Sequence, residues 1–318
     1  MIRALTRSVV LLITLILILS SVACQRSIYG TESRTDFDPN HFTITNPSTL
    51  GGTILSDVTY SRQNGENLNL DIYYPKVVTG LVPTIVYVHG GAWISGDKQE
   101  VKEIIGMPAF LEAGFAIVSI NYRLAPQYKF PASIKDVRCA IRFLRAYGDK
   151  FNLATEKIGA YGCSAGGHLV SLLGVADENS AWNSVEYYSY SSSVQAVVDM
   201  YGPTDLTAQF PADEPVKLED VFATNDVNGP VLRDASPAYW VSSTDPPFLI
   251  IHGDIDPLVP LSQSKDFSDR LINAGVDTTL IVVKNGNHGL DSRMDMLPSR
   301  SQLSQTILDF FNQHLLSK

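Results

Sequence analysis

The sequence of 318 residues has little cysteine, a deficit of basic residues and no internal repeat. Its three cysteines are Cys24, Cys139 and Cys163, and their spacing matches no metal-binding pattern. We expect Cys139 and Cys163 to be buried free thiols, with a disulfide between them as the alternative. The 24 Lys and Arg residues against 33 Asp and Glu residues give a net charge of −9. Because phosphate binding requires a basic patch, this balance argues against a nucleic-acid partner.

Long hydrophobic runs are also scarce, and the one at the N-terminus, residues 9–19, is too short to span a membrane comfortably. Arginines precede it and small residues follow it, which predicts an export signal over residues 1–23. Small residues directly before Cys24 resemble a bacterial lipobox, although Ser21 stands where leucine is usual. We therefore predict that Cys24 carries lipid and tethers an exported protein to a membrane. Plain secretion and an uncleaved anchor are the alternatives.

The rest of the chain divides into a polar arm and one folded domain. Residues 24–50 are polar and lack a period, which is typical of a tether. Residues 51–318 begin with an Asn-Gly hairpin and continue with alternating strand and helix patterns, which predicts one α/β domain with a mostly parallel sheet. Residues 207–245 show no clear period and are interpreted as a lid insertion. The expected strands include 53–62, 68–74, 84–88, 116–120, 194–200, 248–252 and 278–283, and the expected helices are 101–113, 131–147, 168–173, 261–274 and 302–316.

One stretch has a clear chemical meaning, the Gly-x-Ser-x-Gly motif centred on Ser164. An apolar run that predicts a buried strand leads into it, and a small-residue helix follows it, which is the context of a nucleophile elbow. In that geometry the serine lies on a strained turn, and its hydroxyl projects above the sheet beside the partial positive charge of a helix N-terminus. The motif alone is a weak signal, because glycine and serine are common in tight turns.

A serine nucleophile needs a base, and the base needs an orienting acid. His288 follows the last expected strand in a glycine-containing loop, and imidazole can accept and return a proton near neutral pH. The acid candidate is Asp256, which follows the preceding strand and which Pro257 favours in an extended conformation. Asp254 is the rival, and either aspartate could instead shape the turn. The order Ser164, Asp256, His288 agrees with a hydrolase triad.

The attacked carbonyl also needs an oxyanion hole. The backbone N–H of Ala165, directly after the nucleophile, is one candidate donor. The others are Gly90, Gly91 and Ala92 after the strand 84–88, where glycine allows a close approach of the backbone to the substrate. The remaining histidines are expected to be structural or solvated, and they are His41, His89, His168, His252 and His314.

Together these motifs resemble those of the α/β-hydrolase superfamily, and more narrowly of the hormone-sensitive-lipase-like and feruloyl- or acetyl-xylan-esterase-like carboxylesterases. The resemblance runs from about residue 55 to the C-terminus, and it implies an α/β-hydrolase fold, hydrolysis of carboxylic esters and no metal or organic cofactor. One departure is Ala92, where the lipase group usually has a third glycine, but alanine still offers its N–H. The matching segments are 89–93, 121–126, 162–167, 252–260 and His288.

The expected function is therefore that of an exported serine esterase that forms an acyl-enzyme. Its expected substrates are short or medium acyl esters, or acetyl and feruloyl groups on polysaccharide. Trp93, Tyr122, Tyr201 and Trp240 are predicted to line the substrate pocket, although aromatic residues are as often part of a core. Two alternatives remain, an amide hydrolase with the same triad and a non-catalytic hydrolase-like binding module. Such modules typically lose a triad member, and none is missing here.

Overall fold

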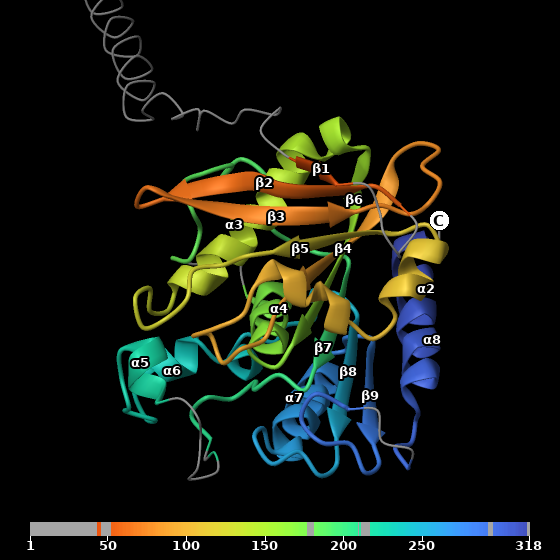
Figure 1. The fold of residues 1–318 in the computed structure, drawn as a ribbon. Coiled ribbons are helices and arrows are strands. Elements are labelled where there is room, and N and C mark those ends of the chain that lie inside the picture. The colour runs from red at the N-terminus through yellow and green to blue at the C-terminus, as the bar shows by residue number, and fades with distance from the viewer. Residues whose placement is uncertain are drawn as a thin grey trace, which may run out of the picture. The chain divides into compact units, whose positions relative to one another are not determined.

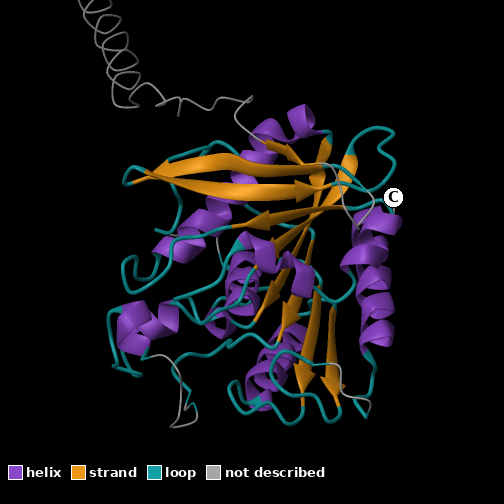
Figure 2. Cartoon of the chain, in the orientation of Figure 1, coloured by secondary structure: helices purple, strands orange, loops and turns teal. Residues whose placement is uncertain are grey.

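The structure is a computed structural model, and it describes residues 43–45, 52–176, 181–208, 210, 217–291 and 295–316. The predicted export signal, Cys24 and most of the predicted tether lie outside the described residues. Within the described ranges, no helix combines the length and the apolar composition needed to cross a membrane. The folded unit is built around one twisted sheet with helices on both faces (Figure 1, Figure 2).

The sheet begins with an antiparallel part, as the Asn-Gly signal predicts. β2 (Ile54–Gln63) and β3 (Glu66–Tyr73) form a hairpin whose turn residues Asn64 and Gly65 have φ angles of 52° and 85°. Asn and Gly tolerate these left-handed conformations, so the turn residues fix the hairpin. β1 (Thr43–Thr45) pairs antiparallel with β2 at the outer edge.

The remaining strands pair parallel with one another and carry the continuous apolar runs of the sequence. Within the described residues the strand order is β1-β2-β3-β5-β4-β6-β7-β8-β9, with β3 antiparallel to β5. Central strands that are covered by helices on both faces need apolar side chains on both faces, which explains the runs. The strand bounds are β4 (Val82–Val88), β5 (Ala116–Ile120), β6 (Leu153–Cys163), β7 (Ala196–Met200), β8 (Phe248–Gly253) and β9 (Thr278–Val283).

Helices cover both faces of this sheet. α2 and α8 contact each other over one face, where Phe110, Tyr161 and Phe311 belong to one hydrophobic core cluster. α3 and α4 contact each other, and α4 and α7 pack against the strands from the other face (Figure 1). The helix bounds are η1 (Lys98–Glu103), α2 (Met107–Glu112), α3 (Ala132–Tyr147), η2 (Gly148–Phe151), α4 (Ala165–Val175), α7 (Leu261–Asn273), α8 (Arg300–Phe311) and η4 (Asn312–Leu316).

The helix expected over 168–173 is longer at both ends, as α4, and for two other helices local residues explain the difference from the sequence expectation. The helix expected over 101–113 is split into η1 and α2, because Gly106 adopts a φ of 102° that interrupts helical geometry. The closing helix begins two residues early, at Arg300, because Ser299 and Gln302 form a capping box there. The described part of the predicted lid insertion contains α5 (Leu218–Phe222), α6 (Pro230–Asp234) and η3 (Pro237–Tyr239).

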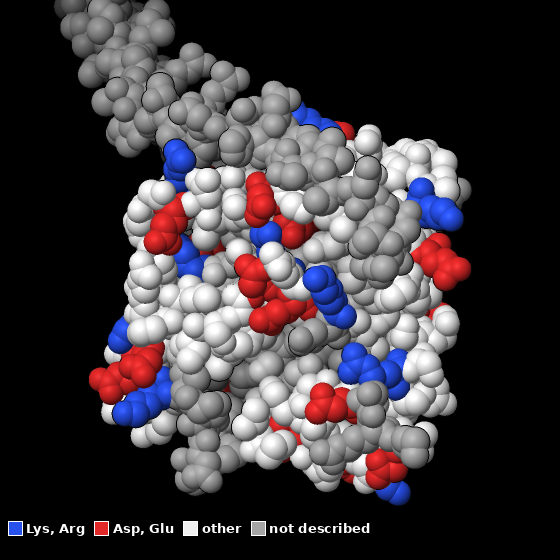
Figure 3. Space-filling model, in the orientation of Figure 1, with Lys and Arg blue, Asp and Glu red and all other residues white. Residues whose placement is uncertain are grey.

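Two cations of the described residues, Lys98 and Arg123, are held by carboxylates. The buried ammonium of Lys98 lies 2.9 Å from Asp71 Oδ1 and 3.1 Å from Asp57 Oδ1. The Arg123 guanidinium binds Asp136 through two nitrogens, at 2.8 and 2.7 Å. On the face drawn in Figure 3, the acidic and basic side chains of the described residues are interspersed. The described residues of this face therefore form no extended basic patch of the kind that binds a polyanion.

Candidate active site

Ser164 lies on the turn between β6 and α4, as the Gly-x-Ser-x-Gly motif predicts. Its backbone has a φ of 55° and a ψ of −118°, a conformation that residues with a side chain rarely adopt. Glycines make this turn possible. A Cβ at Gly162 would overlap the Gly166 carbonyl oxygen, and a Cβ at Gly166 would overlap the carbonyl oxygen of Val88. The close crossing of β6, α4 and the end of β4 thus holds the serine at the carboxyl end of the sheet.

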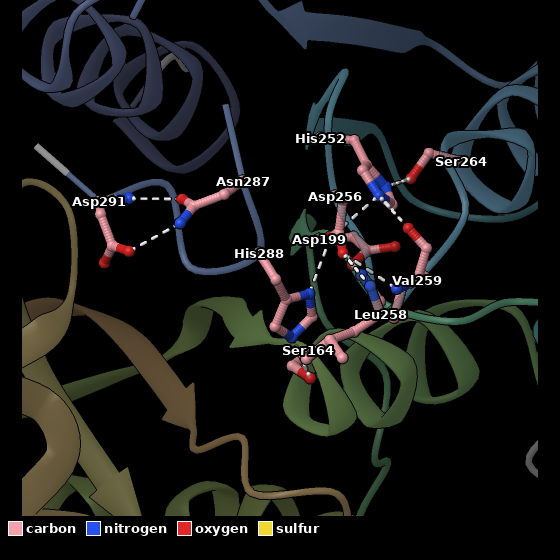
Figure 4. A network of polar contacts seen from close by, with 11 residues as sticks. Ser164, Asp199, His252, Asp256, Leu258, Val259, Ser264, Asn287, His288 and Asp291 are labelled. Atoms are coloured by element: carbon pink, nitrogen blue, oxygen red, sulfur yellow. Dashed lines mark hydrogen bonds and ion pairs between the residues drawn. The ribbon is translucent and has the colours of Figure 1, made fainter. Parts of the chain in front are cut away.

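Three side chains that are far apart in the sequence meet at this turn (Figure 4). His288 Nε2 lies 2.9 Å from Ser164 Oγ, and His288 Nδ1 lies 2.8 Å from Asp256 Oδ2. An ionised carboxylate can only accept hydrogen bonds, so the proton of the neutral imidazole belongs on Nδ1. Nε2 is then free to accept the proton of the serine hydroxyl. The structure thus brings together the three residues predicted for the triad, in an arrangement suited to proton transfer from Ser164 to His288.

The carboxylate of Asp256 is held by donors on both oxygens. Oδ1 accepts from the backbone N–H groups of Leu258 at 2.8 Å and Val259 at 3.0 Å. Oδ2 faces His288 and lies 3.3 Å from His252 Nε2. Burial by itself would raise the pKa of Asp256, but the hydrogen bonds from His252 and His288 outweigh burial and hold this pKa below its ordinary value. Asp256 is therefore an anion whenever His288 has to accept a proton.

Asp254, the rival acid, has a different environment. It is exposed, and its backbone N–H donates to the Val283 carbonyl at 3.0 Å, which extends the pairing of β8 with β9. A Cβ at the preceding residue, Gly253, would overlap the Gly286 carbonyl oxygen, so glycine is needed where the two loops cross. The carboxylate that reaches His288 belongs to Asp256.

The loop that carries His288 is braced by contacts that the sequence analysis did not identify. Asn287 Nδ2 donates to Asp291 Oδ2 at 2.8 Å, and the Asp291 N–H donates to Asn287 Oδ1 at 3.2 Å (Figure 4). Arg300 Nη1 donates to the Leu290 carbonyl at 2.8 Å. The Asn-x-x-x-Asp spacing was the sequence signal for the first brace, whereas nothing in the sequence signals the second.

The loop after β4 is fixed from within the protein by two stacked rings. The His89 and Tyr122 rings stack with 4.3 Å between centroids, and the Tyr122 hydroxyl lies 3.0 Å from the His89 carbonyl and 3.2 Å from the Gly90 carbonyl. His89 Nδ1 also lies 2.8 Å from the Gly90 carbonyl. Burial lowers the pKa of His89 to about 4, so its ring is neutral near pH 7. His89 therefore orders this loop, as expected for a structural histidine.

The residues predicted for the oxyanion hole lie beside the nucleophile. Ala165 is the first residue of α4, so its N–H is among the helix-terminal groups that have no intrahelical acceptor. Gly91 and Ala92 have φ angles of 95° and 52°. Ala92 and Ala165 both line the pocket that contains Ser164. A Cβ on Gly90 would lie 3.5 Å from Ser164 Cβ, so this loop backbone passes directly against the nucleophile.

An apolar pocket of about 70 Å³ opens at Ser164. Trp93 forms part of its wall, and the indole Nε1 donates to His168 Nδ1 at 3.1 Å. Phe222 of α5 packs edge-on against Trp93 with 5.3 Å between ring centroids, so the predicted lid insertion supports this wall. The other lining residues are Ala92, Ala165, Pro203, Leu206, Phe210, Leu218, Leu258, Val259 and His288.

Of the aromatic residues predicted for the pocket, Trp93 lines it and two others lie behind it. Tyr122 is buried under the loop after β4, as described above. The buried Tyr201 ring packs against the His288 ring at an angle of 63°, with 4.8 Å between centroids. Neither tyrosine is among the residues that line the pocket. Tyr201 instead contacts His288, which lines the pocket, and Tyr122 contacts His89 and the Gly90 carbonyl in the loop after β4.

The prediction that Trp240 lines the pocket is wrong. Its ring packs against Trp182 with 5.2 Å between centroids, and its Nε1 donates to the Asp234 carbonyl at 2.7 Å. These contacts hold Trp240 in a different hollow, together with Gln195 and Asp245. This location could not be predicted from the sequence, because it depends on how the insertion packs against the end of α4.

The remaining histidines and cysteines agree in part with the sequence analysis. His168 and His252 are fully buried and hydrogen-bonded, and His41 lies outside the described residues. Cys139 and Cys163 are not joined by a disulfide, as predicted, although Cys163 is half-buried rather than buried. Across the described part of the chain, no group of three or more His, Cys, Asp or Glu side chains is arranged to hold a metal ion.

Comparison with known proteins identifies the family. Residues 70–271 match the model of the BD-FAE family. The chain belongs to this family. It is 35% identical to esterase LipC of Mycobacterium tuberculosis over 64% of this chain and 51% of LipC. It is also 35% identical to esterase LipQ of the same organism, over 74% of this chain and 57% of LipQ. This member of the BD-FAE family thus spans about half the length of the curated relatives it matches.

Solved structures of esterases share the fold of this chain. A truncated carbohydrate esterase from gut microbiota is 31% identical, with a TM-score of 0.74 over 86% of this chain and 100% of that chain. The esterase Est2 of Thermogutta terrifontis, bound to butyrate, is 22% identical with a TM-score of 0.68, over 87% of this chain and all of that chain. The similarity to Est2 shows that the two chains share a fold. The prediction of an α/β-hydrolase fold related to carboxylesterases is confirmed.

Proposed function

We propose that the protein is a serine esterase that hydrolyses carboxylic esters through Ser164, His288 and Asp256. The observation that carries this proposal is the hydrogen-bonded line from Asp256 through His288 to Ser164 at an apolar pocket. In the first step Ser164 Oγ attacks the ester carbonyl carbon while its proton passes to His288 Nε2. The esterase relatives support ester hydrolysis as the reaction class.

Charge then develops on the carbonyl oxygen of the substrate. In the proposed mechanism the N–H of Ala165 and N–H groups of the Gly90–Ala92 loop donate to this oxyanion, and losing one such donor typically costs about 3 kcal/mol of transition-state stabilisation. The tetrahedral intermediate collapses, the C–O bond to the alcohol breaks, and His288 returns its proton to the leaving oxygen. Water then attacks the acyl-enzyme by the same route, with His288 as the base, and frees Ser164.

The size of the pocket supports a short acyl chain as the substrate. Its volume is about 70 Å³, and Trp93, Leu206 and Leu218 are among its apolar walls. Each methylene transferred from water into such a pocket contributes about 0.8 kcal/mol, so kcat/KM should rise with chain length until the pocket is full and then fall. We therefore propose acetyl to butyryl esters as the preferred size. The carbohydrate-esterase neighbour supports an ester linked to a carbohydrate as the natural substrate, and of the acetyl and feruloyl groups only acetyl falls within this size range.

The test measures purified wild-type protein and a Ser164→Ala variant on p-nitrophenyl esters from acetate to decanoate, on acetylated xylan and methyl ferulate, and on matched anilides. We expect hydrolysis of the short esters, and a loss of about a million-fold in kcat for Ser164→Ala. A fluorophosphonate should label Ser164 in the wild type. The matched control is Ser268→Ala, because Ser268 is another buried serine and lies on α7 outside the pocket.

Three outcomes separate the proposal from its alternatives. Faster turnover of anilides than of the matched esters would assign an amide hydrolase. A folded wild type without activity on either class, and without fluorophosphonate labelling, would assign a non-catalytic binding module. Labelling at a serine other than Ser164 would move the nucleophile elsewhere in the chain.

A further inference from the structure

A second histidine touches the carboxylate of Asp256 from the side away from His288 (Figure 4). His252 is the penultimate residue of β8 and is fully buried. Its Nε2 lies 3.3 Å from Asp256 Oδ2 and 2.9 Å from the Val259 carbonyl. Its Nδ1 lies 2.7 Å from the hydroxyl of Ser264 on α7. The ring therefore links a strand, a helix and the loop that carries Asp256.

The chemistry of these partners determines where the proton of His252 is. A carbonyl oxygen and an ionised carboxylate can only accept, so Nε2 carries the hydrogen and shares it between Val259 and Asp256. In the neutral ring Nδ1 is then an acceptor, and the hydroxyl of Ser264 can donate to it. All three contacts of the ring are satisfied by one tautomer.

We propose that His252 is a positioning residue that aims the Asp256 carboxylate at His288. Val259 donates its N–H to Asp256 Oδ1 and its carbonyl accepts from His252, so Val259 connects the two residues through both of its backbone groups. Oδ1 of Asp256 is held by backbone donors, whereas Oδ2 is held by the two imidazoles. Without His252, the side chain of Asp256 keeps its Oδ1 contacts but loses the contact that fixes the direction of Oδ2. The proposal rests on the triad assigned in the proposed function.

Two substitutions of His252 distinguish positioning from simple packing. Gln can place an amide N–H near the former Nε2 position and can still donate toward Asp256 and Val259. Asn reaches only the former Nδ1 position, so it keeps a partner for Ser264 and loses the donor toward Asp256. Both replacements are polar and differ by one methylene, which makes them a matched pair.

The experiment measures kcat and KM for p-nitrophenyl acetate with wild type, His252→Gln and His252→Asn, after urea unfolding has confirmed that each is folded. We expect His252→Asn to lower kcat about ten- to a hundredfold with KM within about threefold, because misplacing a catalytic group by a fraction of an ångström to about 1 Å costs this much. We expect His252→Gln to stay within about fivefold of the wild-type kcat. Equal kcat values for the two variants, or a wild-type kcat for folded His252→Asn, would overturn the proposal.

A second measurement needs no variant and no activity. A histidine-selective ¹⁵N–¹H spectrum of the wild-type protein reports the tautomer of each ring, and we expect His252 to carry its hydrogen on Nε2. A hydrogen on Nδ1 alone would overturn the proposal even if His252→Asn did not fold, because the ring could not then donate to Asp256. An inactive wild type would refute the proposed esterase function, whereas an active wild type with the wrong tautomer would refute the role of His252 alone.

Discussion

Asp199 provides a prediction that combines the packing of the nucleophile elbow with a pH dependence. It lies on β7 and is fully buried, with Oδ1 accepting from the Gly202 N–H at 2.8 Å and Oδ2 accepting from the Ser171 hydroxyl at 3.0 Å. Burial raises the pKa of Asp199 from 3.8 to about 6, although these hydrogen bonds and the nearby His252 act in the opposite direction. The folded protein therefore holds a proton on Asp199 at a pH where the unfolded chain has released it.

The sign of the effect follows from linkage. Because the folded-state pKa is above the unfolded value, the contribution of Asp199 to stability is fully present below pH 3.8 and is lost as the pH rises through about 6. A difference of about two pKa units corresponds to about 3 kcal/mol at high pH, of which about 2 kcal/mol is lost between pH 4.5 and pH 8.

The perturbation is Asp199→Asn, which keeps an oxygen for the Gly202 N–H and stays neutral at every pH. We expect the stability of Asp199→Asn relative to wild type to rise by about 2 kcal/mol from pH 4.5 to pH 8. Urea unfolding followed by circular dichroism, repeated across this range, measures the difference. The other titrating groups are common to both proteins and cancel.

The control for this prediction is Ser171→Ala, which removes one hydrogen-bond partner of Asp199 but leaves the carboxyl group. Its stability should be lower than that of wild type, while the carboxyl-dependent loss of stability with rising pH should persist. A pH-independent difference between Asp199→Asn and wild type would refute the reasoning, and so would a difference that falls as the pH rises.

Three further predictions concern the site and the N-terminus. Asp256→Asn should lower kcat about ten-thousandfold, because asparagine favours the wrong imidazole tautomer, whereas Asp254→Asn should lower kcat far less. The kcat values of the two variants are compared at one pH, after circular dichroism has shown that both are folded to the same extent. Gly162→Ala should abolish stable folding or activity, since its Cβ would overlap the backbone of the elbow, and a soluble, fully active variant would contradict this. Cys24 lies outside the described residues, and we predict that it is lipidated. Wild-type protein expressed in a bacterium should then partition with membranes, whereas mass spectrometry of Cys24→Ser should find no lipid. An unmodified N-terminus in the wild type would contradict lipidation and leave plain secretion.

The parts of the fold that could be predicted from the sequence are those that local residues determine. The bounds expected for β5 and β9 agree with the observed bounds at both ends, and Asn64-Gly65 correctly predicted the hairpin turn. The break in the helix expected over 101–113 was not predictable, because the apolar period of the sequence continues across Gly106 whereas the helical backbone conformation is interrupted there. Hydrophobic periodicity indicates which face of an element is buried. It does not indicate where one residue within the pattern has a positive φ angle.

In the candidate site, residue type and order indicated which groups take part, and the fold determined which groups support them. Ser164 and His288 each follow a strand in a glycine-containing turn, and such turns leave a local signature in the sequence. The support from Tyr201 leaves none, because its contact with His288 joins segments that are distant in the chain. His252 and Asp256 are only four residues apart, but which of their atoms meet depends on how the loop after β8 folds. Trp240 illustrates the converse, since this aromatic residue within the insertion had the right chemistry for the pocket but lies elsewhere.

The choice between Asp254 and Asp256 depends on the register of the sheet. β8 and β9 pair in parallel as far as Gly253 and Val283, and the N–H of Asp254 still bonds to the Val283 carbonyl. Ile255 then donates to the carbonyl of Gly286, so the chain runs along its neighbour for two residues beyond the strand. Asp256 is the first acidic residue after this pairing ends, and there the chain can turn its carboxylate toward the loop of His288. The number of residues between the end of β8 and the aspartate, rather than the presence of an aspartate, thus decides which carboxylate orients the base.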